Sequence, residues 1–137
     1  MDTERDYTPT MADFIAANRV TMTSEPTDHN PHMDDSGHMH HYRCTLRCGS
    51  RRMSLTFSMG SAHKGHPTLP DVLDCLARES YDVEGNSFET FAADMGYDAD
   101  SRKALKTYNV IVRQMRALGR LLGPDAYSTL LYGTERL

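Results

Sequence analysis

Apolar residues recur along this chain with a helical period at first, then alternate with polar residues, and return to a helical period in the second half. The first segment predicts a short helix over residues 10–18, because Thr10 can cap it and Asp13 stands three residues later, as in a capping box. A short strand is predicted over residues 20–23. Residues 24–37 hold few large apolar side chains and several turn-forming ones, which predicts a long loop.

The clearest pattern is a strict alternation on either side of residues 48–49, which predicts a β-hairpin. A two-residue turn at Cys48 and Gly49 pairs Arg47 with Ser50. The apolar face of this hairpin then holds Tyr42, Cys44, Leu46, Met53, Leu55 and Phe57. The polar face holds Arg43, Thr45, Arg47, Ser50, Arg52, Ser54 and Thr56. A slip of one residue would mix the two faces, so the alternation favours this separation.

Four further helices are predicted in the second half of the chain. One begins at Thr68, a short one is opened by residues 86–89, a long one covers residues 101–122, and Asp125 caps the last. The resulting order, one helix, three strands and four helices, predicts an α+β fold. Its expected architecture is a small three-stranded antiparallel sheet with helices packed on one face.

The length of 137 residues, 39% of them apolar, predicts a flexible N-terminus over residues 1–9 and a single α+β domain over residues 10–137. No apolar run resembles a signal peptide or reaches the roughly twenty residues of a membrane span. The three cysteines therefore predict free thiols in a cytoplasmic protein without a membrane partner.

The net charge of -4 conceals segments of opposite sign. Residues 38–70 and 101–122 contain no acid and carry +5 and +6, whereas residues 71–100 carry -8. Because arginine binds two oxygens of a phosphate or carboxylate with its planar fork, the basic segments are candidate binding surfaces for a partner or for nucleic acid. The candidate residues are Arg43, Arg47, Arg52, Lys64, Arg102, Lys106, Arg113, Arg116 and Arg120.

An alternative reading of these basic residues stays open. Basic residues at these positions are also expected on the solvent-exposed side of an ordinary amphipathic helix and hairpin. In a further alternative, the acidic segment 71–100 covers them in the folded chain. The sequence does not decide between exposed and covered basic faces.

Several histidine and cysteine residues lie in and beside the hairpin, and both residue types are zinc ligands. The residues concerned are His38, His40, His41, Cys44, Cys48, His63 and His66. The alternation, however, places His40 and Cys44 on one face and His41 on the other, and no C-x-x-C pair occurs. Ordinary hairpin-flanking histidines, without a metal or other cofactor, are therefore the expectation.

Catalytic motifs are missing from the sequence as well. Cys75 lies in the middle of a predicted helix, where a small buried side chain is expected rather than a nucleophile. The chain contains no phosphate-binding loop, nucleophile elbow or dinucleotide fingerprint. These observations predict a protein without catalytic residues.

The order of elements over residues 10–80 resembles that of double-stranded RNA-binding domains, which grip phosphates with a basic loop and the start of the following helix. Lys64, close to Thr68, stands in the comparable place. Pro70 and Asp71 stand where such domains carry a lysine cluster, which puts phosphate binding at that helix in doubt.

A second resemblance covers roughly residues 11–137 and concerns short proteins encoded by bacteriophages and integrated mobile elements. It is carried by residues 30–36, 42–45, 57–60, 73–77, 96–98, 100–104 and 134–137. The resemblance brings no assigned active site. It implies that the protein acts in a bacterial host cell, where small accessory phage proteins bind and disable host machinery, CRISPR effectors included.

Three functions follow as hypotheses. The first is a non-enzymatic, anti-CRISPR-like binding protein that inhibits a host nucleoprotein defence system by steric docking, with a host protein or nucleoprotein complex as partner. The second is direct nucleic-acid binding through the hairpin arginines and the basic helix. The third is a metal-dependent enzyme. Met and Tyr residues on short helices leave a homodimer open.

Overall fold

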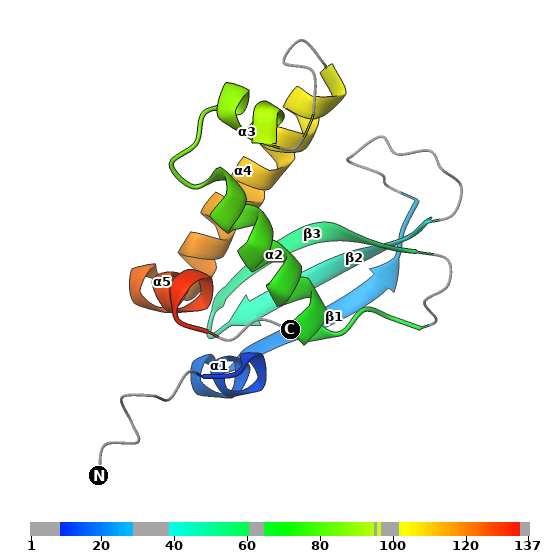
Figure 1. The fold of residues 1–137 in the computed structure, drawn as a ribbon. Coiled ribbons are helices and arrows are strands. Elements are labelled where there is room, and N and C mark those ends of the chain that lie inside the picture. Colours follow the sequence, from blue (N-terminus) through cyan, green and yellow to red (C-terminus); the bar gives the residue numbers. More distant parts are fainter. Residues whose placement is uncertain (1–8, 29–38, 61–64, 95, 97–101, 135–137) are drawn as a thin grey trace.

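The computed structural model describes residues 9–28, 39–60, 65–94, 96 and 102–134 of the chain. The elements are, in order, α1 (Met11–Asn18), β1 (Val20–Pro26), β2 (Met39–Cys48), β3 (Arg51–Gly60), α2 (Leu69–Val83), α3 (Phe88–Asp94), α4 (Arg102–Leu122) and α5 (Pro124–Tyr132). One helix, three strands and four helices follow one another as the apolar pattern predicts, and the α+β fold is confirmed (Figure 1).

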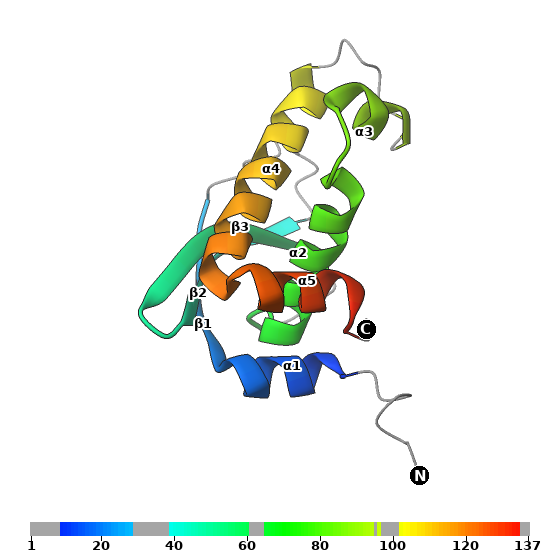
Figure 2. The same ribbon diagram turned by 90° about the vertical axis from the view of Figure 1, so that its left-hand side faces the viewer.

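The three strands form one antiparallel sheet in the order β1-β2-β3, and the helices lie on one side of it, as Figures 1 and 2 show. α2 packs against α4, and α4 also contacts β3, which is an edge strand of this sheet. α3 packs on the half of α4 that extends away from the sheet (Figure 1). None of the described helices covers the other face of the sheet, an arrangement common in small antiparallel sheets (Figure 2).

The main core lies between the apolar face of the sheet and the helices. Its fully buried residues come from α1, β2, α2, α4 and α5 and include Leu46, Leu73, Leu118 and Leu130. Each such side chain contributes about 1.5–3 kcal/mol through the apolar surface it removes from water. A second, smaller cluster joins α3 to α4, where the rings of Phe91 and Tyr108 lie 5.3 Å apart.

The hairpin has the predicted faces but a different register. Arg47 pairs with Arg52 rather than with Ser50, because the turn is made by Gly49 and Ser50. Gly49 has a φ of +64°, as a type II′ turn requires at its first central position, and glycine adopts this conformation without steric cost. A shift of two residues leaves every side chain on its predicted face, so Cys44 and Leu55 are buried as expected.

Two predicted boundaries are wrong. β1 continues through Pro26, because residues 24–26 pair with β2 instead of entering a loop, and an edge strand tolerates proline. α5 begins at Pro124 with Gly123 as its N-cap, whereas Asp125 lies inside its first turn. Residues 1–8 of the predicted N-terminal segment and most of the predicted loop over 24–37 lie outside the described residues.

Helix starts follow the predicted capping chemistry. The Asp13 N–H donates to Oγ1 of Thr10 at 3.1 Å while the Thr10 N–H donates to the Asp13 carboxylate at 3.2 Å, which completes a capping box. At the start of α2, the Asp71 N–H donates to Oγ1 of Thr68 at 3.3 Å. These caps orient α1 and α2 as they enter the core.

Candidate polyanion-binding surface

The solvent-exposed face of the sheet is built almost entirely from hydroxyl and arginine side chains. We call it the open sheet face; its members are Thr21, Thr23, Glu25, His41, Arg43, Thr45, Arg47, Arg52, Ser54, Thr56 and Ser58. Their positions follow from the strand period of two, which sends alternate side chains away from the helices. In the part of the chain that the structure describes, no helix lies on this face (Figure 2).

Positive charge on the open sheet face is poorly compensated. Arg47 and Arg52 stand directly opposite each other, and like charges at such a cross-strand pair are unfavourable. Arg43 lies between Glu25 and Thr56 in the register, yet among the described residues none of these arginines is within ion-pair distance of a carboxylate. A surface that keeps repelling cations together is suited to an anionic partner, which relieves the repulsion.

A groove runs where the edge of β3 meets α4. One hollow of about 410 Å³ is bordered by Arg43, Arg113 and Arg120, and a neighbouring hollow of about 430 Å³ is bordered by Arg51 and Arg52. The two hollows share Ser54, Ala117 and Arg120, so they form one continuous groove. We call it the arginine groove and define it by Arg43, Arg51, Arg52, Arg113 and Arg120.

The helical period explains how α4 contributes to the groove. Val110, Arg113, Ala117 and Arg120 follow one another at intervals of three or four residues, so they form one face directed at β3. Alanine at position 117 is small, which leaves space between the strand and the helix. All five arginines of the groove have exposed side chains.

Arg51 also fastens the hairpin to the end of α4. Its guanidinium donates a hydrogen bond to the backbone carbonyl oxygen of Arg120 at 3.3 Å. Carbonyl groups in the last turn of a helix lack intrahelical partners, and a cation there also complements the helix dipole. This contact joins the two walls of the groove at its hairpin end.

The structure places some of the predicted binding residues in or beside the arginine groove and others away from it. Arg43, Arg52, Arg113 and Arg120 line the arginine groove, and Arg47 stands beside Arg52 on the open sheet face. Arg116 is exposed on α4 outside the groove lining.

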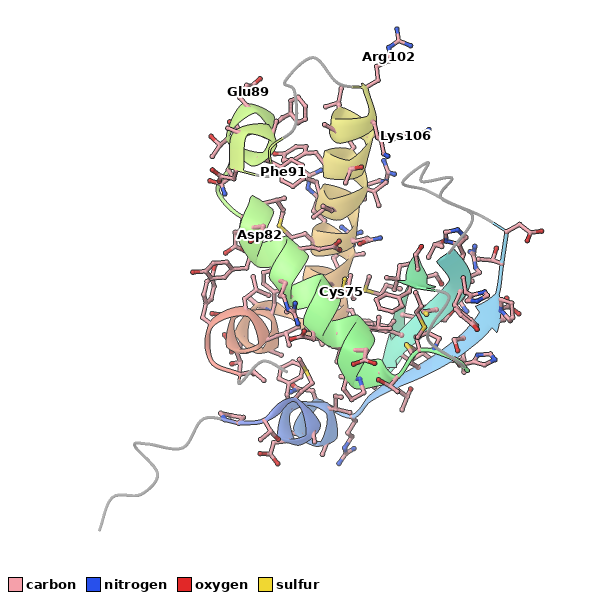
Figure 3. The ribbon with its side chains drawn as sticks, turned by 45° about the vertical axis from the view of Figure 1, so that its right-hand side comes forward. Cys75, Asp82, Glu89, Phe91, Arg102 and Lys106 are labelled. Carbon is pink, nitrogen blue, oxygen red and sulfur yellow. The ribbon has the colours of Figure 1, made fainter. Side chains whose placement is uncertain are left out.

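The remaining predicted residues lie apart from this groove. Arg102 and Lys106 lie on the half of α4 that extends away from the sheet (Figure 3), so the basic line along this helix meets the hairpin only in its second half. Lys64 lies outside the described residues.

Arg51 was not among the predicted binding residues. Its position in β3 has the parity of the apolar side chains Met53 and Leu55, and the predicted faces of the hairpin do not include it. At the hairpin end it extends past the core and reaches α4 instead. The acid-free segment 38–70 was the one sequence signal that included it.

The described acids of the segment 71–100 do not cover the arginine groove. Asp74 is buried and pairs with Arg78 one turn later on α2, and Glu84 accepts a hydrogen bond from the Tyr132 hydroxyl. Asp82 and Glu89 are exposed on α2 and α3 (Figure 3). No ion pair joins a groove arginine to any acid within the described ranges.

Burial favours the neutral form of the Cys44 and Cys75 thiols, whose pKa values are both raised. Burial raises the pKa of Cys75 to about 12, with the nearby Glu79 carboxylate adding to the rise, and burial raises the pKa of Cys44 to about 11. Because the thiolate is the nucleophile and the metal ligand, both cysteines are suited to packing.

The described histidines have ordinary partners. His66 hydrogen-bonds Ser24 at 2.7 Å, and His41 hydrogen-bonds Ser58 at 2.7 Å. His40 is exposed at the end of β2, although the alternation placed it on the apolar face. Among the described residues no three His, Cys, Asp or Glu side chains gather as a metal site would require, and His38 and His63 fall outside them.

Comparison with protein-family models, with curated proteins and with solved structures gives no match to this chain. None of the described helices is long and apolar enough to cross a bilayer.

Proposed function

We propose that this protein binds nucleic acid, with the phosphate backbone lying in the arginine groove and reaching onto the open sheet face. One observation carries the proposal: arginines from β2, β3 and α4 converge on a single groove, and within the described residues no acid pairs with them. Guanidinium groups bind phosphate oxygens bidentately and supply most of the affinity in non-specific binding.

The composition of the open sheet face supports contact with the backbone rather than with bases. Sheets that bind single strands by stacking present aromatic rings, and the described members of this face include none except His41. Threonine and serine hydroxyls, in contrast, are frequent phosphate ligands. Five arginines define the strongest contacts, so about five phosphates are expected to be neutralised.

The negative net charge of the chain restricts where nucleic acid can bind. With a formal charge of -4, most of the surface repels phosphates, and attraction is confined to the two acid-free segments. Binding is therefore expected at one orientation rather than over the whole molecule.

Fluorescence anisotropy with labelled single-stranded and double-stranded oligonucleotides tests the proposal. The double variant Arg113→Glu/Arg120→Glu reverses two groove charges and is expected to abolish binding at low salt. The matched control is Arg102→Glu/Lys103→Glu, which reverses the same number of charges at the end of α4 away from the groove. Absence of binding by the wild type at low salt, or equal losses in both variants, would contradict the proposal.

Steric inhibition of a host nucleoprotein system remains a second proposal. The observation in its favour is the open sheet face beside the groove, which offers a protein surface additional contact area when a strand occupies the groove. Pull-down from a bacterial lysate, with and without nuclease, tests it. Retention of a defence complex that survives nuclease supports this proposal, whereas a complex lost with nuclease reports nucleic-acid binding alone, and retention of none rejects it.

A further inference from the structure

A smaller pocket opens next to the arginine groove, between β3, α2 and α4. It encloses about 190 Å³ and shares Leu55, Thr56 and Gln114 with the main hollow of the groove, so the two spaces adjoin. The pocket is much larger than the roughly 30 Å³ that a water molecule occupies in the liquid. It is also smaller than the roughly 300 Å³ at which drug-sized sites begin. Its size suits one planar ring system.

The lining of this pocket combines apolar walls with two polar side chains that can bind a ligand. Leu55 and Phe57 from β3 and Leu76 from α2 form apolar walls, while Glu79 from α2 and Gln114 from α4 supply a carboxylate and an amide. Gln114 is next in sequence to Arg113, which borders the groove. A ligand phosphate on the arginine and a ligand ring beside the glutamine would thus lie one residue apart along α4.

Glu79 is a partly buried carboxylate that makes no hydrogen bond or ion pair with any other described residue. Burial raises its pKa to about 7, and the Asp82 carboxylate on the same helix adds to the rise. Cys75 is the other titratable group at the pocket, while the side chains that face Glu79 from β3 and α4 carry no charge. The carboxylate oxygens of Glu79 still reach the pocket space and accept no hydrogen bond from the described residues, so they are available to donors of a ligand.

We propose that this pocket takes one unpaired nucleobase of a strand held in the arginine groove, with the N–H groups of the base donating to Glu79. The inference rests on the nucleic-acid binding proposed above and adds the class of ligand. Guanine fits the carboxylate best, because two adjacent N–H donors on its Watson–Crick edge match the two oxygens of a carboxylate. Such recognition requires a base that is free of its partner strand.

A cationic ligand, such as a polyamine, fits the groove less well. It would satisfy Glu79, but it would have to pass the side chains of Arg43, Arg113 and Arg120, which border the adjoining hollow and repel it. An anionic strand that carries a neutral base is attracted by the groove and offers donors to the pocket. The arginines that border the hollow beside the pocket therefore favour the nucleotide.

Anisotropy titrations at pH 8 with matched single strands test the inference. One oligothymidine carries a single central guanine, the second a single adenine, and the third presents the same guanine in a fully paired duplex. The guanine strand is expected to bind roughly tenfold more tightly than the adenine strand, since a bidentate base contact gives about that discrimination. The duplex should lose this advantage.

Two variants separate this inference from the proposed function. Glu79→Gln keeps the shape of the side chain and is expected to remove the guanine preference while leaving the adenine strand bound. Arg113→Glu/Arg120→Glu should remove binding of both strands. At pH 6 the wild type should also lose most of its preference, because the protonated carboxyl accepts fewer donors; Glu79→Gln should show no such pH dependence.

Each outcome of these titrations has a defined meaning. A guanine preference unchanged in Glu79→Gln, or equal affinity for strand and duplex, overturns the base pocket while the arginine result still supports nucleic-acid binding. Unaltered binding by the double arginine variant overturns the proposed function instead. Tighter binding of spermine by the wild type than by Glu79→Gln, without a guanine effect, identifies a cation site and also rejects the base pocket. Thermal unfolding of each variant verifies that it is folded.

Discussion

Replacement of Glu79 by glutamine is expected to stabilise the protein at neutral and alkaline pH. Burial raises the pKa of this carboxyl from 4.5 to about 7, so the native state disfavours its ionised form. Each pKa unit corresponds to about 1.4 kcal/mol, and the ionised side chain therefore destabilises the native state by about 3 kcal/mol above pH 7. Glutamine keeps the size of the side chain and removes the charge.

The pH dependence of this effect has a defined sign. Well below pH 4.5 the carboxyl is neutral in both the native and the unfolded chain, so the wild type and Glu79→Gln should be equally stable. Between pH 4.5 and about 7 the unfolded chain releases this proton first, and the wild type loses stability relative to the variant as the pH rises. Above about pH 7 the difference should stay constant.

Urea denaturation of both proteins at pH 4, 5, 6, 7 and 8 measures this difference in unfolding free energy. Glu89→Gln on α3 is the matched control, because Glu89 is exposed. The same substitution there should give the same pH dependence of the unfolding free energy as in the wild type. A difference that is independent of pH, or no difference at pH 8, would refute the reasoning from burial. The same variant also loses the carboxylate proposed to bind a base, so added stability at the expense of recognition is the combined expectation.

Four other predictions follow from the packing, the caps, the groove and the thiols. Leu118→Ala should lower the unfolding free energy by about 2–5 kcal/mol in urea titrations, because Leu118 is fully buried, and a smaller loss would mean that the core collapses around the cavity. Thr10→Ala should cost about 1 kcal/mol in the same assay through loss of the capping box. The logarithm of the affinity for a single strand should fall against the logarithm of salt concentration with a slope of about -3.5, and a slope near zero would exclude five phosphate contacts. Cys44 and Cys75 should resist iodoacetamide at pH 8 until the protein unfolds, as mass spectrometry can establish, because burial raises the pKa of each thiol.

Local chemistry explains which parts of the fold the sequence predicts well. The capping box at Thr10 and the cap at Thr68 depend on residues three positions apart, so their effect is visible in the sequence. The faces of the hairpin are likewise determined by alternation. The alternation does not determine the pairing register, because a shift of two residues keeps every side chain on the same face. The backbone conformation of Gly49 and the contacts of the folded sheet select the observed register over the predicted one.

The arginine groove depends on tertiary packing that no local pattern specifies. The basic residues of α4 are spaced evenly along the helix, yet only Arg113 and Arg120 face β3, because α4 contacts the sheet with its second half. The contribution of Arg51 depends on a carbonyl group 69 residues further along the chain. The pocket at Glu79 combines three elements, and its carboxylate has no distinguishing neighbours in the sequence.

The order in which the elements are synthesised has a consequence for the folding of this chain in the cell. All three strands have been translated at Gly60, but α4 is complete only at Leu122, and translation of the residues between them takes about 3–12 s. During that interval the apolar face of the sheet, including Leu46 and Leu55, lacks most of its final cover. α2 is the first of the later helices to be made, and its docking would cover part of this apolar face before α4 is complete.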